Sequence, residues 1–305
     1  MKKNLFTKIL NLGESGPFGR TLTFGAAALA IISTVAIVAF IAIKGLSTFY
    51  TNGVSIKEFL FSTSWFPDRE PAEGGPATGV LAFICGSLIV SVTAVLVSAP
   101  LSIISAVFMV EIAPCWGRRV LQPAIELLAG IPSVVYGYIG LSLLVPFIRE
   151  NIGGLGFSVL AGVIVLSVMI LPTITSVSAD SLKALPGEWK EAAYALGSTR
   201  WQAVRIVLLP AARSGLITGI VLGLARAFGE ALAVQMVIGN TRKIPSSILD
   251  PVITLTSAIT MDMGYTPMGS LWNNALWSMG LLLLLMSCFF ILIVRIAVHK
   301  GGVAR

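Results

Sequence analysis

Residues 214–240 read SGLITGIVLGLARAFGEALAVQMVIGN, and this run contains only two ionisable side chains, Arg226 and Glu230. An arginine at mid-bilayer depth costs several kcal/mol, so such a residue faces a protein interior or a water-filled path and has a partner. Residues four positions apart share one face of a helix, which makes Glu230 the expected partner of Arg226. The stretch therefore predicts a membrane-spanning helix with a polar face.

The composition extends this prediction to the whole chain. Of the 305 residues, 11% are charged and 56% are hydrophobic, and the mean hydropathy is +0.91, whereas a soluble domain carries about 25% charged residues. Most of its apolar runs are close to the ~20 residues that a bilayer requires. The runs are Leu22–Ile43, Gly79–Ala113, Ile125–Ile148, Phe157–Ala179, Ser214–Ile238 and Trp272–Val298. We therefore expect an all-α integral membrane protein with six transmembrane helices.

Prolines complicate two of these runs. Pro100 divides the second run, which is either one kinked helix that projects beyond the membrane or a span followed by a short helix. We favour the kinked helix because Ala99-Pro100-Leu101 has no polar turn around it. In the third run, Ile131-Pro132-Ser133 is expected to bend or loosen the helix. The segment Ser246–Met261 is apolar but too short and broken to span, so we expect an interfacial or re-entrant helix there.

Lysine and arginine residues predict the orientation. With the N-terminus in the cytoplasm, fourteen of the 21 Lys and Arg residues fall in inside segments and six fall in outside segments. The positive-inside rule then places both termini in the cytoplasm. The net charge of +7 reflects this asymmetry and attraction to anionic lipid. It does not indicate nucleic-acid binding, because no basic run is interleaved with aromatic residues.

The sequence lacks the patterns of an enzyme or a metalloprotein. Cys85, Cys115 and Cys288 have no ligand or disulfide spacing, and the lone His299 has no Cys, Asp or Glu nearby. Neither a Walker A loop nor a catalytic triad is present in the sequence. The chain is therefore expected to catalyse no reaction and to bind no metal.

The loop between the fourth and fifth runs, residues 180–213, is the most informative one. Pro186-Gly187 breaks the chain, Glu191–Leu196 forms a short helix, and Thr199–Leu209 forms a second helix that Pro210 ends. One interpretation is an amphipathic hairpin that lies on the inner leaflet. The other is a docking element whose small face fits the groove of another protein. Shape and charge alone favour neither.

The spacing within this loop favours docking. Glu191-Ala192-Ala193, three residues, Gly197, nine residues and then Val207-Leu208-Leu209-Pro210 resembles the EAA loop of ATP-binding-cassette (ABC) importer permeases, with valine in place of isoleucine at position 207. In that family the loop forms the coupling helix that fits a cleft of the ATPase subunit. The resemblance implies that coupling to the ATPase rests on Glu191, Ala192, Ala193, Gly197, Leu209 and Pro210.

The resemblance also implies a domain organisation. Residues 79–298 match the ABC importer permease core, including the coupling loop 180–213. Residues 1–78 then form an N-terminal addition, with a cytoplasmic tail, the first transmembrane helix and an outer loop. Residues 299–305 form a cytoplasmic tail.

Within the ABC family, three stretches resemble the PstC-type permease of phosphate-specific importers: Ile125–Gly137, Leu222–Glu230 and Val237–Thr241. The resemblance implies import of inorganic phosphate across a bacterial plasma membrane, with this chain forming half of the path. The implied partners are a second permease (PstA-type), two ATPase subunits (PstB-type) and an extracytoplasmic phosphate-binding protein (PstS-type). ATP and Mg²⁺ would be bound by the ATPase, and no cofactor by this chain.

The candidates for the substrate path or gate are Arg226, Glu230, Glu126 and Gly223. Gly215, Gly219 and Gly223 lie on the same helix face as the charged pair, where another helix or a substrate can approach the backbone. The pair is either part of the path or a structural ion pair. Glu126 either caps a helix N-terminus or gates the path. Glu111, at the end of the second run, is expected to be solvated.

Phosphate has a chemical property that suits this pair. At neutral pH it keeps an acidic proton, which it can donate to Glu230 while Arg226 holds its other oxygens. Fully ionised sulfate has no such proton. Two alternatives remain open: a permease for another oxyanion such as sulfate or molybdate, and a secondary anion transporter. The second would favour an internal repeat with interrupted helices, which the sequence does not show.

Overall fold

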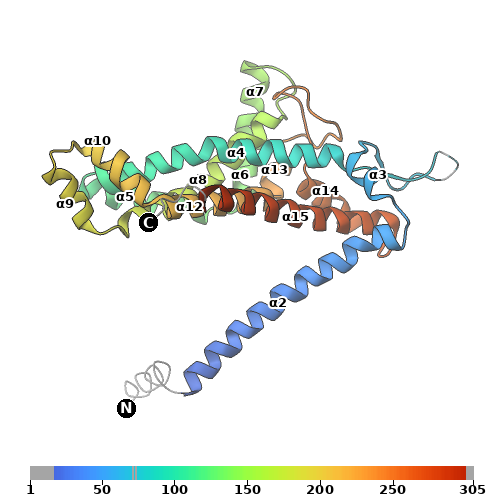
Figure 1. Cartoon of the computed structure of the whole chain (residues 1–305). Coiled ribbons are helices and arrows are strands. Elements are labelled where there is room, and N and C mark those ends of the chain that lie inside the picture. Colours follow the sequence, from blue (N-terminus) through green and yellow to red (C-terminus); the bar gives the residue numbers. More distant parts are fainter. Residues whose placement is uncertain (1–16, 71, 73, 300–305) are drawn as a thin grey trace, which may run out of the picture.

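The computed structural model describes residues 17–70, 72 and 74–299, which are mostly helical (Figure 1). The parts of the two expected tails before Pro17 and after His299 lie outside the described residues. The α-helices are α2 (Pro17–Tyr50), α3 (Ile56–Phe61), α4 (Leu81–Val107), α5 (Cys115–Gly130), α6 (Ser133–Ile139), α7 (Val145–Asn151), α8 (Val159–Lys183), α9 (Gly187–Ala195), α10 (Arg200–Gln202), α11 (Leu209–Ala211), α12 (Arg213–Gly229), α13 (Leu232–Gln235), α14 (Leu255–Asp262) and α15 (Leu271–His299).

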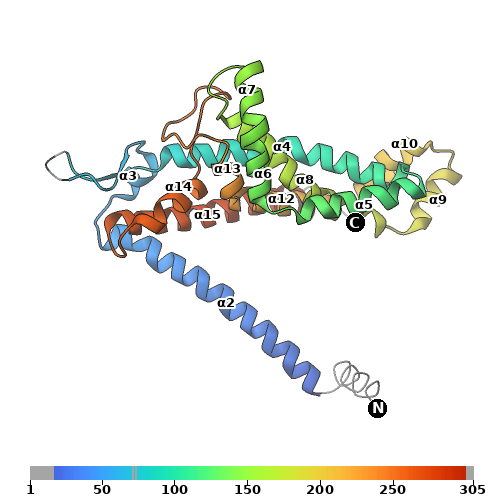
Figure 2. The same cartoon turned by 180° about the vertical axis from the view of Figure 1, so that it is seen from behind.

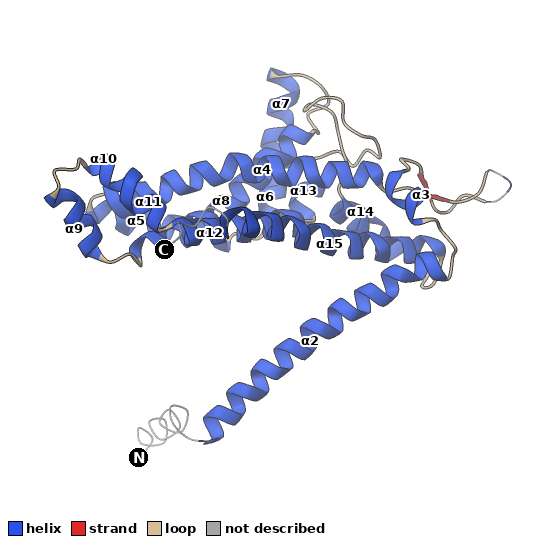
Figure 3. Cartoon of the chain, in the orientation of Figure 1, coloured by secondary structure: helices blue, strands red, loops and turns tan. Residues whose placement is uncertain are grey.

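Short irregular elements complete the described chain. Strands β1 (Trp65–Phe66) and β2 (Ala77–Thr78) form a small antiparallel hairpin (Figure 3). Three π-helical turns and one 3-10 turn join or extend the described α-helices. The π-helices are Phe108–Ile112, Gly140–Leu144 and Ala203–Leu208, and the 3-10 turn is Met263–Tyr265. The prediction of an all-α membrane protein is confirmed.

Helices α4, α8, α12 and α15 run side by side along the long axis of the molecule (Figures 1 and 2). Helices suit a bilayer because each one satisfies its own backbone hydrogen bonds. Buried serines add hydrogen bonds between these helices: Ser91 Oγ donates to the carbonyl of Ala227 at 3.3 Å, and Ser167 Oγ donates to that of Ala94 at 3.1 Å. Each such bond contributes about 0.6 kcal/mol in a membrane, so small polar residues help to fix the register of the bundle.

Six spans are present when each bent helix pair counts as one span. Four helical segments are long and apolar enough to cross a membrane alone: Thr21–Tyr50, Leu81–Ile112, Val159–Lys183 and Leu271–Ile296. The remaining two candidates are pairs, 119–130 with 133–151 and 200–211 with 213–229, which bend by 93° and 69°. The predicted number of spans agrees with this upper count.

The third predicted span, Ile125–Ile148, is not one helix. Ile131 and Pro132 have extended backbone between α5 and α6, and α6 and α7 leave the long axis almost at a right angle (Figure 2). Proline disfavours helical geometry in the residue before it, which accounts for the break at Ile131. The predicted bend is therefore confirmed, and the prediction of a single continuous span is corrected.

The second span is one helix that contains a proline. Pro100 lies inside α4, which continues through the π-helical turn Phe108–Ile112, so the kinked-helix prediction is confirmed. At its other end α4 packs against α14, where Leu255 N–H donates to Ser87 Oγ at 2.8 Å. Helix α4 thus reaches from the end of the molecule that carries α9 and α10 to the end that carries the β-hairpin (Figure 1).

The segment Ser246–Met261 is helical only in its second part. Asp250 accepts the backbone N–H groups of Ser246 and Ser247 at 2.8 and 2.9 Å, which folds the first part into a turn. Helix α14 then begins at Leu255, and its first residues are buried by the surrounding protein. The start of α14 is therefore covered by the bundle, which agrees with the re-entrant alternative, and the choice between an interfacial and a re-entrant helix stays a prediction.

Helix α2 contacts the rest of the chain near its C-terminal end. Ser278 Oγ on α15 donates a hydrogen bond to the carbonyl of Gly45 at 2.5 Å and lies 2.6 Å from the hydroxyl of Thr48, and Asn274 donates to Asn52 at 2.8 Å. The remaining turns of α2 diverge from the bundle (Figure 1) and expose their apolar side chains. The C-terminal end of α15 lies at the same end of the molecule as α9 and α10 (Figures 1 and 2).

Candidate functional site

Arg226 lies on α12, one turn before the end of that helix. Its Nη1 donates a hydrogen bond to Thr173 Oγ1 on α8 at 2.8 Å, and its side chain is partly buried. The phenol of Tyr136 on α6 lies close enough to interact electrostatically with the guanidinium. No carboxylate among the described residues lies within ion-pair distance of Arg226. The helix therefore presents a cation that the described chain does not neutralise.

Glu230 does not pair with Arg226. Helix α12 ends at Gly229, the backbone of Glu230 is extended (φ −74°, ψ 127°), and α13 begins at Leu232. The carboxylate accepts the backbone N–H of Ala233 at 3.0 Å. The predicted ion pair and the continuous fifth span are therefore wrong. The helix breaks before Glu230 completes the turn, and the carboxylate satisfies a free N–H at the start of α13.

The break at Glu230 lies beside a narrow hollow that hydroxyl groups line. The hollow is bounded by Ser87 and Ser91 of α4, by Glu230 and by Thr254 and Thr256 near α14. Thr256 Oγ1 also donates to the backbone carbonyl of Glu230 at 2.8 Å. A carboxylate is thus held where three segments of the chain bring polar groups together.

The glycine track on α12 packs against α8. A Cβ atom at Gly223 would lie 2.6 Å from Ile174 Cδ1, and one at Gly215 would lie 2.1 Å from Ser181 Oγ. Small residues allow two membrane helices to approach closely. The structure therefore assigns Gly223 a packing role next to Arg226. The sequence allowed either a helix or a substrate to approach the glycine face of α12, and in the structure helix α8 lies there.

Gly223→Val is expected to destabilise the protein. The added side chain overlaps Ile174, and overpacking of a close helix contact costs about 1–3 kcal/mol. The measurement is the thermal unfolding midpoint of the purified protein in detergent. Gly280→Val is the matched control, because no atom lies within 4 Å of a Cβ at Gly280 on α15. Equal midpoints for the two variants would contradict the packing role.

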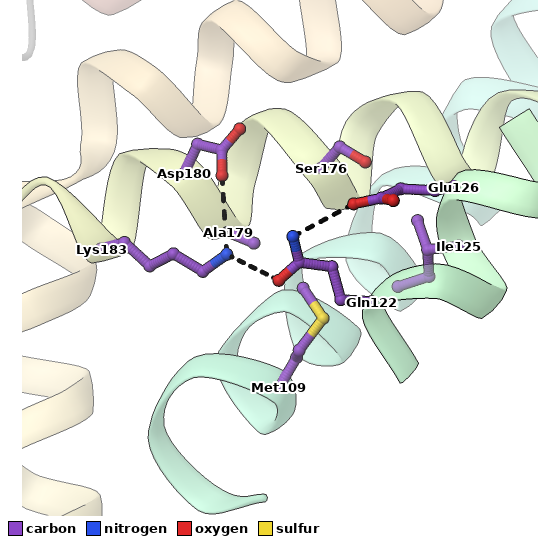
Figure 4. A pocket seen from close by; sticks show the side chains of 8 residues that line it. All are labelled: Met109, Gln122, Ile125, Glu126, Ser176, Ala179, Asp180 and Lys183. Atoms are coloured by element: carbon purple, nitrogen blue, oxygen red, sulfur yellow. Dashed lines mark hydrogen bonds and ion pairs between the residues drawn. The ribbon is translucent and has the colours of Figure 1, made fainter. Parts of the chain in front are cut away.

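Glu126 lies in a polar cluster between α5 and α8 (Figure 4). Its Oε1 accepts a hydrogen bond from Gln122 Nε2 at 3.1 Å, and Gln122 Oε1 accepts one from Lys183 Nζ at 3.2 Å. Lys183 also pairs with Asp180 at 3.7 Å. The cluster connects the two helices through a row of charged and amide groups.

The position of Glu126 excludes one of its two expected roles. Helix α5 begins at Cys115, Pro123 lies inside it, and Glu126 is in its last turns. A carboxylate there cannot act as an N-terminal cap, so the capping alternative is wrong. The sequence misplaced the helix start because the apolar run begins only at Ile125, whereas α5 begins at Cys115. A role for Glu126 as a gate stays a prediction.

The expected coupling loop forms a helical hairpin at one end of the molecule (Figure 1). In α9, Glu191 and Ala192 are exposed, whereas Ala193 is only 5% exposed. Gly197 has φ +79°, a conformation that glycine adopts without strain. Leu196, which precedes Gly197, is 88% exposed. The hairpin thus presents small and apolar groups to its surroundings.

The second arm of the hairpin differs from its prediction at Pro210. The arm continues through the π-helix Ala203–Leu208 into α11, and the sharp bend follows at Ala212. Pro210 therefore does not end the helix. A proline in a helix clashes with the carbonyl four residues earlier, and the wider π-helical turn just before it gives this ring more room. Leu209, beside it, is partly buried.

Glu111 is buried and paired, contrary to the expectation of a solvated residue. It is 8% exposed, lies in the π-helical turn that ends α4, and forms an ion pair with Lys190 of α9 at 2.5 Å. No pattern in the sequence indicates this contact, because 79 residues separate the partners. The contact between Thr173 and Arg226 could not be predicted either, because it depends on the register of α8 against α12.

Comparison with known proteins gives a consistent result. Residues 98–300 match the family described as "Binding-protein-dependent transport system inner membrane component". The chain is 58% identical to the "Probable ABC transporter permease protein YqgH" of Bacillus subtilis, with 91% of this chain and 89% of that protein covered. It is 35% identical to the "Phosphate transport system permease protein PstC" of Haemophilus influenzae, with 79% and 81% covered.

A solved structure shows the same fold. The chain matches a structure of the MetNI methionine ABC transporter in an inward-facing conformation with a TM-score of 0.50 and 21% identity, over 73% of this chain and 92% of that one. This likeness supports the type I importer permease fold. The permease subunits of such transporters are not enzymes, because separate subunits hydrolyse ATP. The chain belongs to the family of binding-protein-dependent transport system inner membrane components and is the permease subunit of an ABC importer.

Proposed function

We propose that this permease imports inorganic phosphate. The observation that carries the proposal is Arg226, a partly buried cation in a membrane helix that is held by the Thr173 hydroxyl and has no carboxylate partner among the described residues. Such a group suits an oxyanion that passes through, because a permanent counter-ion would compete for it. The PstC permeases among its relatives support phosphate as that oxyanion.

Glu230 provides the basis for distinguishing phosphate from sulfate. One of its carboxylate oxygens accepts the N–H of Ala233, and the other is open to a donor. Phosphate keeps a proton at neutral pH and donates it there, while Arg226 binds its remaining oxygens bidentately. Sulfate brings a second negative charge toward the carboxylate without a proton to donate. The separation of Arg226 from Glu230 leaves both groups available for the ion.

The remaining site residues act at the other end of the path. Glu126 and its polar cluster, between α5 and the end of α8, lie at the end of the molecule that carries α9 (Figure 1), the side where phosphate would leave. We assign Glu126 to a gate between α5 and α8, since it holds Gln122, whose amide oxygen accepts the hydrogen bond from Lys183 that joins these two helices. Gly223 supports the site indirectly, by bringing α12 close enough to α8 for Thr173 to reach Arg226.

The complete importer contains further subunits. This chain pairs with a PstA-type permease, one of two PstB-type ATPase subunits docks on the hairpin that contains α9, and a PstS-type protein delivers phosphate on the opposite side. The end of α15 lies at the end of the molecule that carries α9 (Figure 1), so an ATPase on α9 places it in the cytoplasm, and the distribution of Lys and Arg residues places the N-terminus there too. The location is the bacterial plasma membrane. ATP and Mg²⁺ bind to the ATPase.

Uptake by the reconstituted complex tests this function. Proteoliposomes with all subunits should accumulate labelled phosphate only when ATP is present, and excess sulfate or molybdate should compete weakly. Uptake of sulfate with no phosphate uptake would refute the assignment and favour the permease for another oxyanion. A phosphate-binding protein and a P-loop ATPase encoded next to this gene would support the same conclusion independently.

A further inference from the structure

We propose that the ion pair between Glu111 and Lys190 transmits the movement of the coupling helix α9 to α4. The proposal rests on the permease function already shown by the family, and its phosphate measurement rests on the proposed function. Glu111 is 8% exposed and Lys190 is partly buried, with a distance of 2.5 Å between Oε2 and Nζ. This is the most buried of the ion pairs among the described residues.

The position of Glu111 is unfavourable without Lys190. Glu111 is the second-last residue of the π-helical turn that ends α4. The C-terminal end of a helix carries partial negative charge, which repels a carboxylate, and burial removes the water that would screen this repulsion. Lys190 compensates both effects. Loss of Lys190 therefore leaves a buried carboxylate at an unfavourable helix end, and α4 and α9 lose their polar attachment.

Helix α9 has two opposite faces. Lys190 and Ala193, three residues apart, are on the buried face, whereas Glu191, Ala192 and Ala195 are exposed. At 3.6 residues per turn the centres of the two faces lie about 180° apart. An ATPase that closes around the exposed face therefore pushes or turns a helix whose other face is fastened to α4.

The second arm of the hairpin is attached differently. Val204 and Leu208 are buried in an apolar cluster with Ala106, Val107 and Val110 of α4. Apolar contacts resist separation but are not directional. The ion pair adds a directional attachment at one point of α9. Displacement of α9 is thus passed to the end of α4, and the apolar cluster keeps the two in contact.

Helix α4 connects this point to the candidate substrate site. The same continuous helix carries Ser91, which donates to the carbonyl of Ala227, and Ser87, which accepts the N–H of Leu255. Both serines line the hollow that contains Glu230. Coupling between α9 and the hollow beside Glu230 needs a physical element that contacts both, and α4 is such a helix. Glu111 and Lys190 are therefore positioning residues for ATP-driven access.

The test uses the full complex of both permeases, the ATPase and the binding protein. Spin labels at Leu101 on α4 and at Leu143 beyond α6, both exposed, report the distance between these helices. ATP with vanadate should change this distance in the unmodified complex. We expect no change for Glu111→Gln or Lys190→Met, although the ATPase still copurifies. The double variant Glu111→Lys with Lys190→Glu should restore the change.

The phosphate measurement gives a second result. For Glu111→Gln, the number of phosphates imported per ATP hydrolysed should fall by at least about fivefold, whereas a purely structural defect would lower both rates together. Glu150→Gln is the control, since Glu150 is in an exposed pair with Arg149.

The spin-label result needs no substrate. If the unmodified complex imports no phosphate, the proposal that phosphate is the substrate is wrong, but the spin-label test of the ion pair is unaffected. A normal vanadate-induced distance change in Glu111→Gln, or no change in the unmodified complex, would overturn the proposal. If Glu111→Gln fails to assemble, Lys190→Met, on the more exposed partner, decides in the same way.

Discussion

A complex that carries Arg226→Gln is expected to assemble and to lose phosphate uptake by about a hundredfold. A bidentate, charge-assisted contact to an oxyanion contributes about 3 kcal/mol, and each 1.36 kcal/mol is about a factor of ten in rate. The close packing of Gly223 against Ile174 is untouched, so α8 and α12 stay in register. The measurement is the initial rate of ATP-driven uptake at a phosphate concentration below saturation.

Conservative variants separate the charge of Arg226 from its geometry. Arg226→Lys keeps the charge but loses the planar fork, and we expect an intermediate rate. Thr173→Val removes the hydroxyl that positions Nη1 and should lower uptake less than Arg226→Gln does, whereas Thr173→Ser should be close to normal. Normal uptake by both Arg226→Lys and Glu230→Gln would show that neither group lies on the path.

Glu230→Gln is a clean test because the structure separates its two functions. The glutamine side-chain oxygen can still accept the N–H of Ala233, so the start of α13 is kept. Only the negative charge is lost. If that charge receives the phosphate proton, the variant should transport phosphate less well and should be inhibited more strongly by sulfate. An ion pair that merely fixed helix packing is already excluded, because Arg226 and Glu230 do not pair.

The sequence predicted what depends on local patterns. Long apolar runs identified α2, α4, α8 and α15, and the proline at 132 identified the bend between α5 and α6. The break at Glu230 has no comparable signal, since the apolar run continues on both sides. It arises from tertiary contacts such as the hydrogen bond from Thr256 to the carbonyl of Glu230.

The candidate site was predicted in part. The chemical anomaly of an arginine in an apolar run pointed to Arg226, and the spacing of the loop pointed to α9. Partners on other helices, such as Thr173 and Lys190, were not accessible, because a contact between helices depends on their relative rotation and register. Glu111 shows the consequence: a carboxylate at a predicted helix end looks solvated until another helix is placed over it.

The second large effect is expected at Ala192. This residue is exposed on α9, on the face opposite Lys190, and we expect Ala192→Trp to weaken association with the ATPase strongly and to lower transport with it. If the small side chain lets the ATPase groove close tightly around α9, an indole would prevent that closure. Overpacking of a fitted contact costs about 1–3 kcal/mol, which corresponds to a loss of affinity of about ten- to a hundredfold.

Two comparisons assign that loss to docking rather than to folding. Ala192→Ser keeps the side chain small and should retain both copurification of the ATPase and phosphate uptake. The thermal unfolding midpoint of the permease without ATPase should be unchanged by Ala192→Trp, because the position is exposed, whereas Ala193→Trp should lower it, because Ala193 is 5% exposed. If the loop were instead an amphipathic hairpin on the lipid surface, tryptophan at 192 would strengthen membrane contact and leave the ATPase bound. Normal ATPase association with Ala192→Trp would therefore show that the ATPase does not dock on this face of α9.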